Sequence, residues 1–154
     1  LTDCQVSTIR RATNTALGSY IKAINYPQTM NSTGISTVDT LPRDSNEAYL
    51  SIMAHNGGGK ITGGECVVNG NSVIDPISQE LDDYIVNARG LAAVDGVFNY
   101  SFSDGSIKGI LPMQGVTELR LKTTFGTAPE NSNYDLIAVS IRNVPAQMLA
   151  AVRA

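Results

Sequence analysis

The sequence has few of the side chains that catalytic and metal sites need. It contains one histidine, His55, and two cysteines, Cys4 and Cys66. The cysteines do not form a CxxC pair, and the separation of His55 from Cys66 matches no zinc-ligand spacing. A catalytic nucleophile would have to pair with His55, but no serine or cysteine lies in a G-x-S-x-G or similar context. We therefore expect no catalytic, metal-binding or cofactor-binding residue and no cofactor, and predict that the chain is not an enzyme.

Positive charge and long apolar runs are also scarce. The 11 Lys and Arg residues are scattered and are outnumbered by 14 Asp and Glu residues, which gives a formal net charge of −3. Because binding to phosphate backbones needs a basic stripe, we expect no nucleic-acid partner. No apolar run approaches the roughly 18 residues that a membrane-spanning helix needs. The first residues also lack the pattern of a secretory signal.

The remaining composition is typical of one globular domain over residues 1–154. Hydrophobic residues make up 42% of the chain and charged residues 16%, so small polar residues fill much of the surface. A chain of this length buries about two-thirds of its unfolded surface without help from metals. No repeat or linker divides it. The two cysteines are compatible either with a bridge between Cys4 and Cys66 or with two buried free thiols.

The glycine-rich stretch "AHNGGGKITGGEC" at 54–66 matches a phosphate-binding loop only in part. Lys60 follows a glycine as the motif requires, but Ala54 stands at the first glycine position and Ile61 at the hydroxyl position. We interpret the stretch as the end of a short helix, in which Gly57 adopts a left-handed conformation. On this interpretation His55 and Lys60 have no functional role.

Capping-box spacing predicts the starts of two helices. Thr2 and Gln5 begin a long amphipathic helix that ends at Pro27. Its apolar face would carry Val6, Ile9, Ala16, Leu17, Tyr20 and Ile24. A polar loop follows, and Asp44 and Glu47 then begin the short helix that ends before Gly57.

A third helix is predicted over residues 75–90. Asp75 would cap it, Pro76 would take its first position and Gly90 would end it. Its apolar stripe, which we expect to pack on the protein, consists of Ile77, Leu81, Tyr84, Ile85 and Ala88. We interpret the acidic cluster of Glu80, Asp82 and Asp83 as a solvated face and not as a carboxylate site.

The second half of the chain has the pattern of strands. Asn69-Gly70 predicts a tight hairpin turn between short β-prone runs. From Gly96 onward the apolar period changes from about 3.6 residues to 2, in "VFNYSFSDGSIKGIL", "VTELRLKTTF" and "YDLIAVSIRN". Pro145 then begins a short C-terminal helix. The predicted fold is α+β: a long N-terminal amphipathic helix packed on an antiparallel sheet of about four strands.

Two separated segments resemble the globular part of a type IV pilin, in particular of the type IVb branch. The first is "SYIKAINYP", at the end of the N-terminal helix, and the second is "LIAVSIRNVPAQMLAAVRA", a strand that runs into a helix. The matching positions in the second segment are Ala138, Val139, Ile141, Val144, Pro145 and Leu149. The sequence departs from that pattern at Met148, where these pilins usually have a cysteine.

The resemblance implies a structural subunit of an extracellular type IV pilus or a related filament at the cell surface, which acts by assembly and adhesion. Its partners would be other pilin subunits, and an apolar half-helix ahead of Leu1 would hold it in the inner membrane before assembly. The oxidising compartment would favour a disulfide bond between Cys4 and Cys66. A secretion-system pseudopilin and a free-standing secreted binding or adhesin module are the alternatives.

Overall fold

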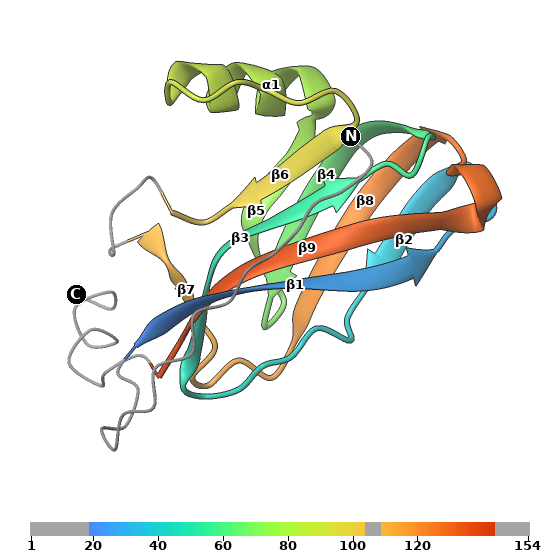
Figure 1. Cartoon of the computed structure of the whole chain (residues 1–154). Coiled ribbons are helices and arrows are strands. Elements are labelled where there is room, and N and C mark those ends of the chain that lie inside the picture. The colour runs from blue at the N-terminus through green and yellow to red at the C-terminus, as the bar shows by residue number, and fades with distance from the viewer. Residues whose placement is uncertain (1–18, 104–108, 144–154) are drawn as a thin grey trace, which may run out of the picture.

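The structure, a computed structural model, describes residues 19–103 and 109–143. Within these ranges the chain is built mainly from strands, with one α-helix, α1 (Gln79–Ala88), and a short 3-10 helix, η2 (Glu130–Ser132) (Figure 1). The strands are β1 (Tyr20–Thr29), β2 (Gly34–Val38), β3 (Glu47–His55), β4 (Lys60–Val68), β5 (Asn71–Ser78), β6 (Val97–Ser101), β7 (Leu111–Pro112), β8 (Leu119–Thr127) and β9 (Asn133–Arg142).

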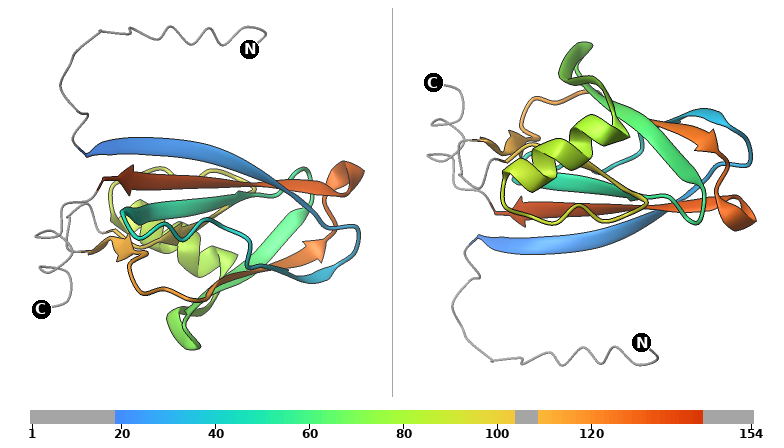
Figure 2. Two further views of the ribbon diagram at one scale, coloured as in Figure 1. Left: turned by 90° about the horizontal axis from the view of Figure 1, so that it is seen from below. Right: turned by 90° about the horizontal axis from the view of Figure 1, so that it is seen from above.

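The strands form two antiparallel sheets that face each other (Figure 2). The first sheet has the order β1-β9-β3-β6, with β7 paired to β3, and the second has the order β2-β8-β4-β5. Leaving the short β7 aside, successive strands alternate between the sheets, and only β4 and β5 follow each other within one sheet. Eight strands connected in this way form a jelly roll.

Alternating side chains fill the space between the sheets. On β8 and β9 the inward positions are buried and the outward positions are only partly covered, as expected for strands with one face on the core. The inward residues of these two strands are Leu119, Leu121, Thr123, Phe125, Tyr134, Leu136, Ala138 and Ser140. The strands predicted over these segments and at 97–101 are therefore confirmed, as is the hairpin turn at Asn69 and Gly70, which have φ values of 49° and 79°.

The predicted α+β fold is wrong, because the described part of the long N-terminal helix is strand β1. Tyr20 and Ile24 lie four residues apart, and this even spacing fits one face of a strand as well as one face of a helix. The part of the predicted helix before residue 19 and the predicted helix after Pro145 lie outside the described residues.

The helix predicted to end before Gly57 is also a strand, β3. The pairing of β3 with β9 shifts register between Tyr49 and Ser51, so Tyr49 and Ile52 are both buried although they lie three residues apart. A β-bulge therefore imitates helical spacing. Gly57 does have a positive φ of 57°, but it lies in the loop between β3 and β4, where a Cβ atom would stand 2.0 Å from the carbonyl oxygen of Asn133.

The two sheets lie in close contact at Gly64 of β4. A Cβ atom at this position would lie 2.5 Å from the Phe98 ring and 2.7 Å from the hydroxyl of Tyr100, both on β6 in the opposite sheet. The Phe98 and Tyr100 rings pack on each other with centroids 4.9 Å apart. The hydroxyl of Tyr100 donates to the carbonyl oxygen of Lys122 at 2.9 Å, so its buried polar atom is satisfied.

We predict that Gly64→Ala lowers the free energy of unfolding by about 1–3 kcal/mol, because the added methyl group overpacks the core at two aromatic rings. Urea unfolding measures this change. The matched control is Gly126→Ala, whose added methyl would meet the side chain of the exposed Thr62 at 2.8 Å, a group that can move away. Equal losses in the two variants would contradict the explanation.

Candidate functional site

Helix α1 lies on the outside of the sandwich and packs against β4, β5 and β6 (Figure 1). Ser78 caps its N-terminus by accepting a hydrogen bond from the Leu81 N–H at 3.3 Å. At the other end the Gly90 N–H donates to Asn87 at 2.9 Å and the Leu91 N–H donates to Val86 at 3.2 Å, which is a Schellman motif. The predicted end at Gly90 is confirmed. The predicted start at residues 75 and 76 is wrong, since both belong to strand β5.

Asp82 determines which face of α1 points inward. Its side chain is buried, and its Oδ2 atom accepts hydrogen bonds from the backbone N–H of Asn99 at 2.9 Å and from the Asn99 side chain at 3.2 Å. Burial raises the pKa of the Asp82 carboxyl, and the two hydrogen bonds from Asn99 oppose that rise. Because Asp82 is tied to β6, Val86 one turn later is buried as well.

The opposite face of α1 is apolar and points to solvent. Leu81 is 45% exposed, Tyr84 71% and Leu91 64%, and Ala88 is exposed between them. We call these four residues the α1 stripe. The expectation that Leu81, Tyr84 and Ala88 pack on the protein is wrong, because the hydrogen bonds of Asp82 to β6 orient the opposite face of the helix toward the sheets. Ile77 is partly buried against the core, as expected.

The three acidic residues of this helix do not form one site. Glu80 is exposed, Asp82 is buried, and Asp83 accepts a hydrogen bond from the Gln79 side chain at 2.8 Å. The interpretation as a solvated face therefore holds for Glu80 and is wrong for Asp82. Arg89, at the C-terminal end of α1, donates to the Ser101 hydroxyl at 2.6 Å and remains exposed.

A shallow groove of about 350 Å³ runs over the outer face of the second sheet. The ion pair between Lys122 and Glu65, with 2.8 Å between nitrogen and oxygen, joins β8 to β4 in its lining. The groove is lined by Ile35, Thr62, Gly63, Gly64, Glu65, Pro76, Ile77, Lys122 and Thr124. Because its lysine and its carboxylate are already paired, the groove offers a mainly apolar and hydroxyl-bearing surface.

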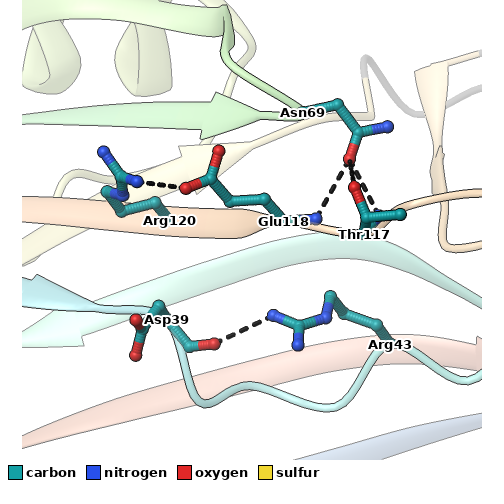
Figure 3. Close-up of polar contacts among 6 residues, drawn as sticks. All are labelled: Asp39, Arg43, Asn69, Thr117, Glu118 and Arg120. Carbon is teal, nitrogen blue, oxygen red and sulfur yellow. Dashed lines mark hydrogen bonds and ion pairs between the residues drawn. The ribbon is translucent and has the colours of Figure 1, made fainter.

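Side-chain hydrogen bonds fasten the loops at one end of the sandwich (Figure 3). The Oδ1 atom of Asn69 accepts from the backbone N–H groups of Thr117 at 2.8 Å and Glu118 at 3.0 Å, and from the Thr117 hydroxyl at 3.0 Å. Arg120 pairs with Glu118, and Arg43 donates to the carbonyl oxygen of Asp39 at 3.0 Å. The hydrogen bonds of Asn69 hold the β4–β5 turn against the segment before β8.

A buried ion pair fastens the end of β9. Arg142 Nη2 lies 3.0 Å from Oε2 of the buried Glu47, and its Nη1 donates to Asp44 at 2.9 Å. The Ser140 hydroxyl donates to the other oxygen of Glu47 at 2.5 Å. Burial and the Glu47 carboxylate raise the pKa of the neighbouring Tyr49. One guanidinium thus bridges two carboxylates, Asp44 and Glu47, which is the arrangement of a structural network.

The structure does not bring the predicted site residues together. His55 is exposed at the end of β3, opposite Asp135 of β9, and Lys60 is exposed at the start of β4. Cys66 is buried in the core, where burial raises the pKa of its thiol to about 12. Cys4 lies outside the described residues, so its bridge to Cys66 stays a prediction.

Residues 19–103 and 109–143 offer neither a metal-binding cluster nor a membrane-spanning helix. No group of three or more His, Cys, Asp and Glu side chains is placed to hold a metal ion there. No helix in those ranges is both long enough and apolar enough to cross a membrane. The features that remain are the α1 stripe, the groove on the second sheet and the fastened loops.

Comparison with known families gives the decisive observation. The model of the viral coat protein P2 C-terminal domain family matches residues 20–141. The chain belongs to this family. The match extends from the start of β1 to within one residue of the end of β9, so the coat-protein domain is the jelly roll itself.

Solved structures agree with the coat-protein fold. The crystal structure of the major capsid protein P2 from Bacteriophage PM2 is similar, with a TM-score of 0.74, 20% sequence identity, and coverage of 88% of this chain and 49% of that chain. A quasi-atomic model of the PBCV-1 virus capsid is similar with a TM-score of 0.56 at 10% identity, covering 84% of this chain and 49% of that chain. The chain thus spans about half the length of each. No curated protein sequence matches it.

Membership of the coat-protein family overturns the pilin resemblance. Pilin subunits and the inner membrane are wrong as partners, and a cell-surface pilus filament is wrong as the location. Of the residues that carried the resemblance, Ala138, Val139 and Ile141 do lie in a strand, β9, but that strand is central in a jelly roll. The others, from Val144 onward, lie outside the described residues.

Asp82 and Asn99 form the contact that sequence reasoning missed. The sequence does contain a signal, since Asp82 shares one side of the helix with Val86, four residues later, and a carboxylate on that side needs a hydrogen-bond partner when the side is buried. We predict that Asp82→Ala lowers the free energy of unfolding by about 2 kcal/mol, because the Asn99 donors are left unpaired. Asp82→Asn, which keeps an acceptor oxygen, should lose less in the same urea unfolding measurement.

The raised pKa of Asp82 also predicts a pH dependence. Because the pKa of the folded chain lies above the unfolded value, titration of this group contributes stability that is fully present below the unfolded pKa. That contribution is lost as pH rises through the folded pKa. Asp82→Asn does not titrate, so the stability difference should shift in favour of the variant as pH rises through this window. A difference that stays constant with pH would argue against a raised pKa.

Proposed function

We propose that the chain is a structural domain of a viral coat protein and that it functions by packing against other coat subunits in the shell of a virion. The observation that carries this proposal is the family match over residues 20–141. The similar structures are both capsid proteins by their descriptions. Their chains are about twice as long, so the assembly of the whole subunit is part of the proposal.

The features of the described surface support a structural role without catalysis. Its one histidine, His55, stands at the end of a strand, and the buried Glu47 carboxylate is paired with the partly exposed Arg142. The loops are held by side-chain hydrogen bonds, such as those of Asn69, that stiffen the domain. A domain stiffened in this way suits a building block that must keep one shape in many copies.

The edge strands of the two sheets limit how coat subunits could pair through their backbones. The outermost strands are β1 and β6 in the first sheet and β2 and β5 in the second. Pro27 lies in β1 and Pro76 in β5, and proline cannot donate a hydrogen bond to an added strand. We therefore expect coat subunits to contact one another through sheet faces, helix α1 and loops in preference to these two edges.

The location of the protein tests this function. Particles purified by density gradient from a culture that produces the protein should contain its peptides among their most abundant components by mass spectrometry. Antibodies raised against the 154-residue chain should label intact particles in immunoelectron microscopy. Peptides that are absent from the particles but present in the cellular fraction would overturn the proposal.

A further inference from the structure

The sequence contains two Asn-Gly dipeptides, Asn56-Gly57 and Asn69-Gly70, and the structure places both in turns between consecutive strands. An asparagine before glycine is chemically labile, because glycine has no Cβ atom to keep its backbone nitrogen away from the asparagine side chain. The two sites share this local chemistry. They differ in what holds the carboxamide of the asparagine.

The carboxamide of Asn69 is held by a distant part of the chain. Its Oδ1 atom accepts from the Thr117 N–H at 2.8 Å, and from the Thr117 hydroxyl and the Glu118 N–H at 3.0 Å (Figure 3). Its Nδ2 atom donates to the carbonyl oxygen of Gly115 at 3.1 Å. These partners lie between 46 and 49 residues away in the sequence. If this side chain turned toward its own backbone, all these hydrogen bonds would break.

The carboxamide of Asn56 is held by its own loop. Its Oδ1 atom accepts from the Gly58 N–H at 3.1 Å, and its Nδ2 atom donates to the Gly59 carbonyl oxygen at 2.7 Å. Because these partners come two and three residues later, the side chain is folded back over the backbone of Gly57. The hydrogen bond from the Gly58 N–H also stabilises negative charge that develops on Oδ1 during an attack on the carboxamide.

We propose that Asn56-Gly57 is a site of spontaneous deamidation in the folded domain and that the hydrogen bonds of Asn69 protect Asn69-Gly70. In the reaction the Gly57 backbone nitrogen loses its proton to hydroxide and forms a bond to the Cγ atom of Asn56. The Cγ–Nδ2 bond breaks, and the nitrogen takes a proton from water and leaves as ammonia. The cyclic succinimide then takes up water and opens to aspartate or isoaspartate.

Solvent exposure alone leads to the opposite expectation. Asn69 and Gly70 are exposed, whereas Asn56 and Gly57 are partly buried. Water nevertheless reaches Asn56, because this residue lines a pocket of about 320 Å³ together with the exposed Lys60 and Asp95. Both sites are therefore accessible to hydroxide and water, and the hydrogen bonds of the two carboxamides determine which site reacts faster.

The product loosens a contact between two loops. The Gly57 carbonyl oxygen accepts from the Glu130 N–H at 2.9 Å, and Gly57 lies directly against the backbone of Asn133, so the β3–β4 loop is fastened to the start of β9. Isoaspartate adds a main-chain carbon before Gly57 and displaces these groups. Both products also replace the Nδ2 donor with a carboxylate oxygen, which repels the Gly59 carbonyl oxygen.

Peptide mapping of the 154-residue chain tests the assignment. Trypsin cleaves after Lys60, so Asn56 and Asn69 fall into separate peptides, and mass spectrometry with fragmentation follows the conversion of amide to acid at each residue. When the folded protein is stored in mildly alkaline buffer, Asn56 should convert at least several-fold faster than Asn69. In concentrated urea, where the hydrogen bonds are lost, the two rates should become similar.

Three variants serve as controls. Asn56→Ser cannot form a succinimide and should remove the acidic species that isoelectric focusing detects after storage, whereas Asn31→Ser, at an exposed residue of the β1–β2 loop, should not. Thr117→Val removes one donor to Oδ1 of Asn69 and should raise the rate at Asn69 several-fold while the rate at Asn56 stays unchanged. Circular dichroism should show that every variant is folded.

The outcomes separate this inference from the proposed function. Equal rates at the two sites in the folded chain, faster conversion of Asn69, or conversion of Asn56 only in urea would overturn the proposal. The inference goes beyond the coat-protein function and does not depend on it, because the reaction needs only the folded chain and water. Peptides that are missing from virus particles would overturn that function and leave the deamidation site unaffected.

Discussion

The close approach of the two sheets at Gly64 is the constraint on which the rest of the structure depends. A hydrogen in place of a side chain lets the Phe98 and Tyr100 rings lie against the backbone of β4. This contact brings β6 close enough for the Tyr100 hydroxyl to reach the backbone of β8 at Lys122. The position of β6 then fixes Asn99, and Asn99 holds Asp82 and with it the orientation of α1. The outward direction of the α1 stripe is therefore a consequence of packing between the sheets.

The strands that could be predicted from the sequence are those with uninterrupted alternation. In β8 and β9 every second residue faces the core, so a period of two identifies them without knowledge of their partners. Strand β3 could not be identified in this way, because its bulge at Tyr49 and Ser51 gives buried residues a helical spacing. Strand β1 was mistaken for a helix for a related reason, since a spacing of four residues fits one face of a helix and one face of a strand. The jelly-roll order depends on pairings between distant segments, which local patterns do not encode.

The candidate site shows the same division between local and distant causes. Gly90 ends α1 through a hydrogen-bond motif within a few residues, so the sequence predicts it. The face of α1 that turns inward depends on Asn99 in β6, which no helical pattern in residues 79–88 can reveal. The apolar residues of the stripe were expected to pack on the chain itself. That expectation is wrong because an apolar pattern in the sequence predicts that a helix has an apolar face but does not show which surface covers it. The pilin resemblance failed for the same reason, since it relied on a strand followed by a proline and not on how strands pair.

The buried core and the exposed α1 stripe are separate surfaces of this domain. The core between the sheets supplies the stability of the fold, and the stripe adds nothing to it while α1 faces solvent. A substitution at Tyr84 should therefore leave the stability of the jelly roll nearly unchanged. A substitution at Asp82 should lower that stability, because its hydrogen bonds to Asn99 orient the helix that carries the stripe.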